Sequence, residues 1–370
     1  MIARKNNRIL FLFAQNDIGG HTKFVLNMIK SFETENIHTE VYVPWFTHFY
    51  YTKKNRMRNS PSDVLVWIRY FLGQIKSEIG IRRFQWRGNS LKISNAKLSR
   101  YLFYPDKAFL NTFDFIVLTG HFQLKELIEL NIDLTKVIYV IHHLHSKKIE
   151  EFGNEINRPE FNIVVSSTRT AGECVQLGIK NFKVAKLGVD TSIFKPWALQ
   201  KIQTVNLKIG FFYYSNSRKN PSLIESIILK LIEVNSDIYI HIFGNGYKRK
   251  HDRIFIHENL SEMKYAYELS RLDLFIYISK LEGFGLPPLE AMASGVPVIS
   301  SNVGAVSEYM DHGEDGYIVS VDAEINEWIY EIEKLISNYD LRSKFSANGV
   351  KKAKNWTWDK TSKIYKELIK

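Results

Sequence analysis

The sequence predicts an α/β protein made of two doubly wound parallel-sheet domains that face each other across a cleft. Three observations support this prediction. The chain has 370 residues, more than the roughly 250 to 300 at which one hydrophobic core stops growing. Short apolar runs alternate with segments of helical periodicity, as expected for parallel strands buried on both faces. This alternation is interrupted near residues 195–204 and then starts again.

The first half begins with an apolar run at residues 8–14, which ends at a loop containing Gly19 and Gly20. Apolar residues then recur at helical spacing from Phe24 to Phe32, so the pattern is strand, glycine loop and helix. Further strands are expected at 40–43, 115–118, 137–141 and 163–165, and helices at 124–130 and 169–177. We therefore expect an N-terminal domain at residues 1–197, with an insert at about 51–100.

In the second half, strands are expected at 205–214, 238–243, 254–256, 274–278, 297–300 and 316–319, with helices at 222–234, 261–269 and 286–293. These elements predict a C-terminal domain at residues 198–355. Doubly wound sheets bind ligands beyond the carboxyl ends of their strands. The expected site is therefore the cleft between the domains.

Composition excludes several classes of protein. With 45% hydrophobic, 14% aromatic and 24% charged residues, the chain can bury large cores and is not disordered. The single cysteine, Cys174, can form neither an internal disulfide nor a thiolate metal cage, which fits a reducing compartment. No apolar run approaches the roughly 18 to 20 residues of a membrane span, and residues 9–14 are too short for a signal-peptide core. We therefore expect a cytoplasmic protein.

The formal net charge of +11 is concentrated in residues 51–100, which contain twelve basic and two acidic side chains. The basic ones are Lys53, Lys54, Arg56, Arg58, Arg69, Lys76, Arg82, Arg83, Arg87, Lys92, Lys97 and Arg100, and the acidic ones are Asp63 and Glu78. Residues 64–79 between them are rich in apolar residues at helical spacing. Either this helix packs on the N-terminal sheet with solvated basic ends, or residues 53–100 form an interfacial surface attracted to anionic lipid. No nucleic-acid partner is expected, because no recognised binding fold accompanies the charge.

Residues 281–295 carry the richest chemical pattern. After the strand expected to end near Ser279, Gly283 and Gly285 permit a close backbone approach, and the prolines at 287–288 fit a first helical turn. Free amides at such a helix start would face an anion such as a diphosphate. Glu282 then lies in the loop and Glu290 about one turn inside the helix, where carboxylates can accept hydrogen bonds from sugar hydroxyls. The alternative is that both glutamates are simply solvated and the glycines only make a turn.

The string from Leu281 to Val298 resembles the signature of retaining glycosyltransferases of family 4, the glycosyl transferases group 1. Their signature is two glutamates separated by seven residues within Glu-Gly-Phe-Gly-Leu-Pro, followed by Glu-Ala-Met-Ala-x-Gly-x-Pro-Val. Segments resembling the same family lie at 165–168, 187–196, 303–308, 313–319 and 356–360. The resemblance implies the GT-B fold of two Rossmann-like domains, with a closing helix at 356–370 that crosses back onto the N-terminal domain. Residues 45–110 match no family segment.

By position, the resemblance implies that Glu290 binds the donor ribose and that Glu282 contacts the donor sugar near the reacting centre. His121, within Gly-His-Phe, resembles a histidine that borders the donor sugar, although a capping or surface histidine is the alternative. Lys219 stands where the family has a phosphate-neutralising lysine. No arginine occupies the usual earlier position, so Arg218 is the candidate substitute. The other candidate donor-binding residues are Gly19, Gly20, Gly244, Gly283, Phe284, Gly285 and Leu286. An ordinary strand-to-helix turn is the alternative at Gly19 and Gly20, and a simple turn is the alternative at Gly244.

The implied activity is transfer of a hexosyl or deoxyhexosyl group, with retained anomeric configuration, from a UDP-, GDP- or dTDP-type donor. The implied acceptor is a glycan or a lipid-linked molecule at the inner face of the cell membrane. The resemblance implies neither a metal nor a cofactor. His142, His143 and His145 lack a carboxylate or cysteine partner at recognisable spacing, so no metal site is predicted from them. Two alternatives remain open: an inactive GT-B subunit that binds glycan or a partner enzyme, and a nucleotide-sugar epimerase or hydrolase.

Overall fold

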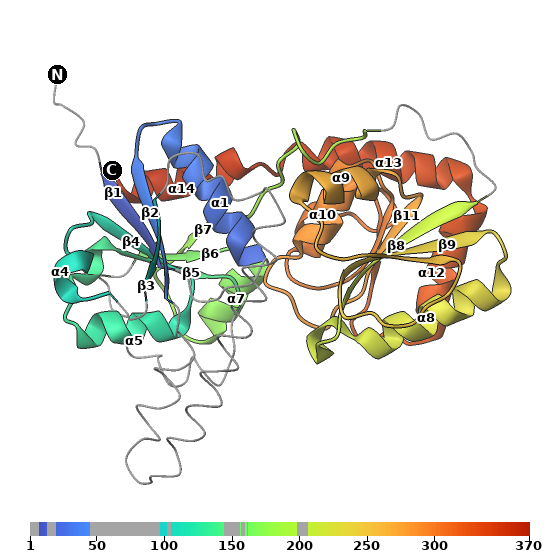
Figure 1. Ribbon diagram of the computed structural model, residues 1–370, viewed down its shortest axis with the longest axis horizontal. Helices are drawn as coiled ribbons and strands as arrows, with labels where there is room; N and C mark the ends of the chain where they lie inside the picture. The colour runs from blue at the N-terminus through green and yellow to red at the C-terminus, as the bar shows by residue number, and fades with distance from the viewer. Residues whose placement is uncertain are drawn as a thin grey trace, which may run out of the picture.

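The computed structural model describes residues 7–12, 20–44, 97–101, 105–143, 156, 160, 162–197 and 206–370. Two α/β domains lie side by side, each built around its own sheet (Figure 1). Most of the basic segment at 51–100, including the helix expected at 64–79, lies outside the described residues, as do Gly19 and His145.

The N-terminal domain contains a seven-stranded parallel sheet in the order β3-β2-β1-β4-β5-β6-β7. Its central strands are apolar on both faces, and Ile9 to Leu12 in β1 are all buried, as helices on both sides of a sheet require. The strands are β1 (Arg8–Leu12), β2 (His38–Pro44), β3 (Lys97–Tyr101), β4 (Phe115–Leu118), β5 (Val137–Ile141), β6 (Asn162–Val165) and β7 (Lys183–Val184). The helices are α1 (Gly20–Glu33), α4 (Lys107–Leu110), α5 (His121–Glu129), η1 (Leu134–Lys136) and α7 (Thr168–Gln176).

The C-terminal domain contains a six-stranded parallel sheet in the order β10-β9-β8-β11-β12-β13. Its strands are β8 (Leu207–Tyr214), β9 (Ile238–Asn245), β10 (Ile254–His257), β11 (Leu274–Tyr277), β12 (Val298–Ser301) and β13 (Tyr317–Val319). Its helices are η2 (Ser217–Lys219), α8 (Pro221–Val234), α9 (Glu262–Ser270), α10 (Leu286–Ala293), α11 (Val306–Tyr309), α12 (Ile325–Ser337) and α13 (Tyr339–Ala353). Both sheets are therefore doubly wound, as the sequence predicts.

Each strand predicted from an apolar run corresponds to an observed strand, with ends that agree to within two residues. Sequence reasoning missed β3 and β7. The strand β3 lies at the edge of its sheet and reads Lys-Leu-Ser-Arg-Tyr, with a single aliphatic residue. The strand β7 has only two residues. Short or polar edge strands leave too weak an apolar signal to be detected from sequence.

The strand order reverses between β1 and β4 in one sheet and between β8 and β11 in the other. Loops on either side of such a reversal diverge to opposite faces and leave room for a ligand at the carboxyl edge. The two carboxyl edges meet, because Gly283 after β11 lies so close to the His142 carbonyl after β5 that an added Cβ would overlap it. The loop after β11, at the switch point of the C-terminal sheet, therefore adjoins the domain boundary.

The last helix, α14 (Trp358–Leu368), follows α13 and lies against α1 of the N-terminal domain (Figure 1). The Ser31 and Ser362 hydroxyls are 2.7 Å apart, and the rings of Phe24 and Tyr365 are 5.4 Å apart. The chain thus ends on the domain in which it began.

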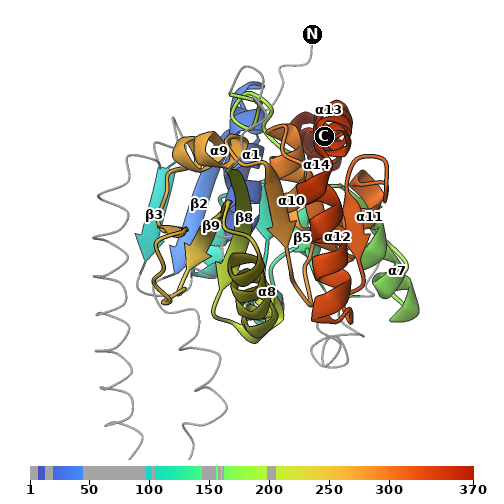
Figure 2. The same ribbon diagram turned by 90° about the vertical axis from the view of Figure 1, so that its right-hand side faces the viewer.

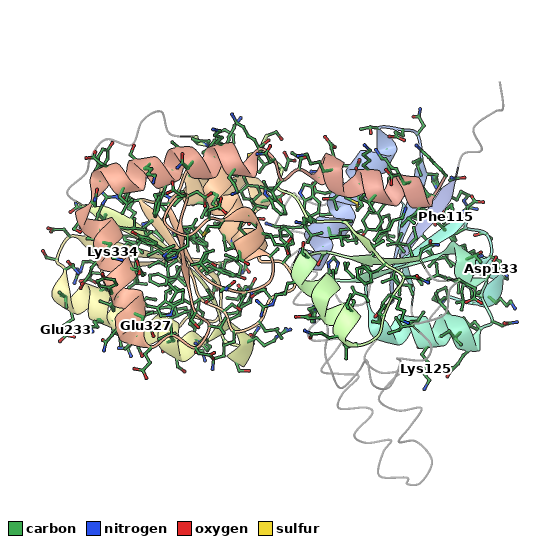
Figure 3. The ribbon with its side chains drawn as sticks, turned by 180° about the vertical axis from the view of Figure 1, so that it is seen from behind. Phe115, Lys125, Asp133, Glu233, Glu327 and Lys334 are labelled. Atoms are coloured by element: carbon green, nitrogen blue, oxygen red, sulfur yellow. The ribbon has the colours of Figure 1, made fainter. Side chains whose placement is uncertain are left out.

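Charged side chains such as Lys125, Asp133 and Glu233 lie on the outside of the protein (Figure 3). None of the described helices is long and apolar enough to cross a membrane.

Gly188 lies against the start of α14, so a substitution there tests how closely this helix is packed on the N-terminal domain. A Cβ at this position would overlap the backbone of Thr357 and Trp358, and backbone cannot rotate away as a side chain can. We expect Gly188→Ala to lower the free energy of unfolding, measured by urea denaturation, by about 2 kcal/mol or more. The control is Gly172→Ala in α7, where a new Cβ meets nothing within 4 Å and stability should hold or rise. Equal stability of the two variants would contradict this packing.

Candidate active site

The loops after β8 and β11 are joined to each other at the switch point of the C-terminal sheet. The Lys280 backbone N–H donates to the Arg218 carbonyl oxygen at 2.7 Å. Asn216 caps the short helix η2 by accepting from the Lys219 backbone N–H at 3.2 Å. The Lys219 side chain is thereby directed from the end of β8 towards the loop that follows β11.

Lys219 forms an ion pair with Glu282. The Nζ atom of Lys219 contacts Oε1 of Glu282 and donates to the Tyr277 hydroxyl at 3.0 Å. The Ser279 hydroxyl lies 2.6 Å from the same Oε1. Burial, together with the Glu282 charge, raises the pKa of Tyr277 well above its ordinary value, so this hydroxyl stays neutral. An ammonium has three N–H donors, and the third remains for a ligand.

The loop before α10 is fixed by its aromatic residue. Phe284 is buried, and its ring lies 5.7 Å from the ring of Tyr309 and 6.0 Å from that of Trp356. Its carbonyl accepts from the Ala305 backbone N–H at 2.8 Å. Gly304 passes so close to Phe284 that an added Cβ would overlap it. Phe284 therefore anchors the loop from inside the protein.

Helix α10 has fewer free backbone amides at its start than the four of an ordinary helix. Gly285, with φ of +87°, precedes the first residue, Leu286, and its carbonyl accepts from the Tyr309 hydroxyl at 2.6 Å. The next two residues, Pro287 and Pro288, lie in the first turn and have no N–H. Of the four amides that a helix start leaves without an intrahelical partner, those of Gly285 and Leu286 remain for an anion.

Glu290 is the fifth residue of α10 and faces the other domain. Its side chain is only 4% exposed, and Oε1 contacts Nζ of Lys23, a residue in the first turn of α1. Lys23 Nζ also lies 3.9 Å from Glu262 and 5.0 Å from the centre of the Phe194 ring. Burial raises the pKa of Glu290, and the Lys23 ammonium opposes that rise. Sequence analysis did not identify Lys23 as a site residue.

The Tyr265 ring also belongs to this cluster. Lys23 Nζ lies 5.4 Å from its centre. The Tyr265 hydroxyl is buried beside the Glu290 carboxylate without a hydrogen bond of good geometry. Burial and the Glu290 charge raise the pKa of Tyr265 well above its ordinary value, so it remains neutral.

The remaining predicted residues lie at the same two strand edges. Gly20 begins α1, and His121 begins α5 directly after β4. Gly244, with φ of +121°, lies near the end of β9 against the Tyr213 carbonyl. The Arg218 side chain is exposed. Within the described parts of the chain, no group of three or more His, Cys, Asp or Glu is arranged to hold a metal ion.

A second contact between the domains involves Glu308. Its carboxylate accepts from the Thr168 backbone N–H at 2.7 Å, the Thr168 hydroxyl at 2.8 Å and the Arg169 backbone N–H at 3.2 Å. It also pairs with Lys186 at 2.8 Å. A carboxylate of the C-terminal domain thus caps α7 of the N-terminal domain. Its negative charge lies at the positive end of that helix, which is favourable. Figure 2 shows α11 and α7 next to each other, away from α1 and α9.

The Glu308 contact gives a testable prediction. The substitution Glu308→Ala removes the acceptor for two backbone N–H groups. We expect this loss to destabilise the start of α7 by about 1 kcal/mol. Hydrogen exchange at Thr168 and Arg169 should then accelerate roughly fivefold. The control is Glu314→Ala, a carboxylate that is 68% exposed and pairs with Lys344. Unchanged exchange in Glu308→Ala would show that the contact does not hold α7.

Parts of the chain are similar to known proteins. Residues 216–352 match the family described as glycosyl transferases group 1. The lipopolysaccharide core biosynthesis mannosyltransferase LpsB of Rhizobium meliloti is 35% identical over 106 residues, which cover 27% of this chain and 30% of that protein. The capsular polysaccharide biosynthesis glycosyltransferase CapM of Staphylococcus aureus is 31% identical over 106 residues, 27% of this chain and 28% of that protein. The chain thus matches less than a third of the length of either relative.

The structural comparison extends over nearly the whole chain. The structure of Anabaena Alr3699/HepE in complex with UDP-glucose has a TM-score of 0.71 and 14% sequence identity, and the match covers 97% of this chain and 98% of that one. At this identity the likeness establishes the fold. The predicted GT-B arrangement of two Rossmann-like domains is confirmed.

Proposed function

Since the chain belongs to the glycosyl transferases group 1 through its residues 216–352, we propose that it transfers a sugar from a nucleotide-sugar donor to a hydroxyl of a glycan or glycolipid, with retention of configuration. The observation that carries this proposal is the pairing of Lys219 with Glu282 at the switch point, with the buried Glu290 eight residues further on. A cation for a diphosphate and two carboxylates for hydroxyls are the groups that such a donor requires.

In this proposal the donor lies along the carboxyl edge of the C-terminal sheet. Glu290 accepts hydrogen bonds from the ribose hydroxyls, and the amides of Gly285 and Leu286 contact the diphosphate. Glu282 accepts from hydroxyls of the transferred sugar. The HepE neighbour was solved with UDP-glucose, which supports a UDP-type donor here, with GDP and dTDP types as the alternatives.

The reaction breaks the bond between the anomeric carbon and the diphosphate oxygen and forms a bond from that carbon to the acceptor oxygen. The acceptor proton passes to the departing phosphate on the same face of the sugar, so the configuration is retained. Lys219 stabilises the charge that develops on the leaving diphosphate, which is where a fixed cation lowers the barrier most. Its contacts with Glu282 and Tyr277 hold the ammonium in place before the donor arrives.

We assign donor binding to the C-terminal domain and acceptor binding to residues 1–197, with His121 bordering the donor sugar. The matched relatives named for lipopolysaccharide core and capsular polysaccharide biosynthesis support a cell-surface polysaccharide or glycoconjugate as the product. A lipid-linked acceptor would place the enzyme at the inner face of the cell membrane, with the basic segment at 53–100 as the candidate contact.

The ribose assignment is tested with Glu290→Gln. This variant keeps the size of the side chain but weakens hydrogen bonds from hydroxyls, because a neutral amide is a poorer acceptor than a carboxylate. We expect nucleotide affinity to fall roughly tenfold to a hundredfold. The measurement is a thermal-shift screen with UDP, GDP, ADP and dTDP, followed by calorimetry. The control is Glu333→Gln, at an exposed position of α12. Wild-type affinity in Glu290→Gln would exclude a role in ribose binding.

The sugar-contacting role is tested with Glu282→Gln. We expect nucleoside diphosphate binding to stay within about threefold of wild type while release of nucleotide from the nucleotide sugar falls by at least a hundredfold. A nucleoside diphosphate carries no transferred sugar for Glu282 to contact, so only turnover of the nucleotide sugar should depend on this carboxylate. Nucleotide release is followed by a coupled assay with and without a polysaccharide extract as acceptor. Rapid release without any acceptor would favour a hydrolase, and undiminished transfer would refute the assignment.

A further inference from the structure

Lys23 is the only basic side chain among the described groups that surround the Glu290 carboxylate. From α1 comes Lys23 itself, from α9 come Glu262 and the neutral Tyr265, and from α11 comes the neutral Tyr309. The neighbouring carboxylate Glu262 and the burial of Glu290 both disfavour the ionised form, and Lys23 opposes them. The charge state of Glu290 therefore depends on a residue of the other domain.

Two aromatic rings hold the ammonium of Lys23 in position to contact Glu290. It lies over the faces of Phe194 and Tyr265, at 5.0 and 5.4 Å from the ring centres, where a cation is attracted to the ring electrons. It approaches Oε1 of Glu290. Each carboxylate oxygen can accept more than one hydrogen bond, so the pair still leaves acceptor capacity for two hydroxyls. Lys23 and a ribose can thus contact Glu290 together.

We propose that Lys23 is a positioning residue of the donor site, which keeps Glu290 in the carboxylate form that accepts the ribose hydroxyls. This inference rests on the proposed function. It adds that the nucleotide site of the C-terminal domain is completed by α1 of the N-terminal domain. A protonated Glu290 would have one donor and a weakened acceptor in place of two strong acceptors, and would bind ribose less tightly.

The sign of the pH effect follows from the charge of the ion pair. Removing Lys23 takes away the group that lowers the pKa of Glu290, so the pKa rises further. Binding that needs the carboxylate is present above this pKa and is lost as the pH falls through it. A variant without Lys23 should therefore lose nucleotide affinity at a higher pH than the wild type. A purely structural ion pair would change affinity by the same factor at each pH.

The experiment uses the full chain and the substitution Lys23→Met, which keeps an unbranched apolar stem against Phe194 and Tyr265. Calorimetry with UDP, GDP and dTDP is run between pH 5 and pH 8. The ionisation of the nucleotide itself is common to all variants and cancels in the ratios. The matched control is Lys30→Met on the same helix, whose side chain is 57% exposed and pairs with Asp190 at 3.9 Å.

As the pH is lowered, Lys23→Met should lose affinity at a higher pH than the wild type or Lys30→Met does, and each unit of that shift corresponds to about a tenfold change in the protonation equilibrium of Glu290. In a Glu290→Gln background, Lys23→Met should produce no additional pH dependence, because the titrating group is gone. A wild-type pH profile in Lys23→Met would overturn the inference. So would tighter binding, which would mean that Lys23 competes with the ribose.

The same measurements separate failure of this inference from failure of the proposed function. If Glu290→Gln weakens binding while Lys23→Met keeps the wild-type pH profile, only the role of Lys23 is refuted. If Glu290→Gln binds each nucleotide as tightly as the wild type does, the ribose assignment fails and the role of Lys23 fails with it. If the wild type binds none of the three nucleotides, the proposed donor class itself is wrong.

Discussion

Two carboxylates at a domain boundary, Glu290 buried and Glu282 partly buried, are the constraint on which the rest of this structure depends. An ionised carboxylate taken out of water is costly unless a cation and hydrogen-bond donors replace its hydration. Glu282 has Lys219 and the Ser279 hydroxyl, both supplied by the ends of neighbouring strands of one sheet. Glu290 has Lys23, supplied by the first turn of a helix in the other domain. Satisfying the second carboxylate therefore requires both domains.

The domain boundary combines this ion pair with contacts of a different kind. Glu308 accepts two backbone N–H groups at the start of α7, and α14 is packed along α1 with Gly188 against its first residues. Those contacts involve backbone and helix ends that a ligand does not replace. The Lys23–Glu290 pair, by contrast, involves side chains to which we assign a ligand. The same boundary thus contains contacts that fix the domains and one contact that a donor would share.

The sequence predicted the two parallel sheets and both glutamates because each has a local signal. Buried strands are apolar runs, and glycines, prolines and glutamates at fixed spacing describe a loop and the helix that follows it. The edge strand β3 lacked this signal because three of its five residues are polar and only one is aliphatic. Lys23 and Glu308 could not be assigned, since each acts on a partner more than a hundred residues away. Only the packing of one domain on the other brings these partners together.

One local feature of the sequence nevertheless marks Lys23 as unusual. A cation in the first turn of a helix lies near the positive end of the helix dipole, where an acidic residue would be favoured, and the first turn of α1 contains no acidic residue. Such a placement is unfavourable for the isolated helix by about 0.3 to 1 kcal/mol, a cost that a carboxylate partner elsewhere in the fold would offset. The buried Glu290 carboxylate is that partner. Because Lys23 lies outside residues 216–352, the stretch that carries the family match contains both glutamates but lacks the cation that keeps one of them charged.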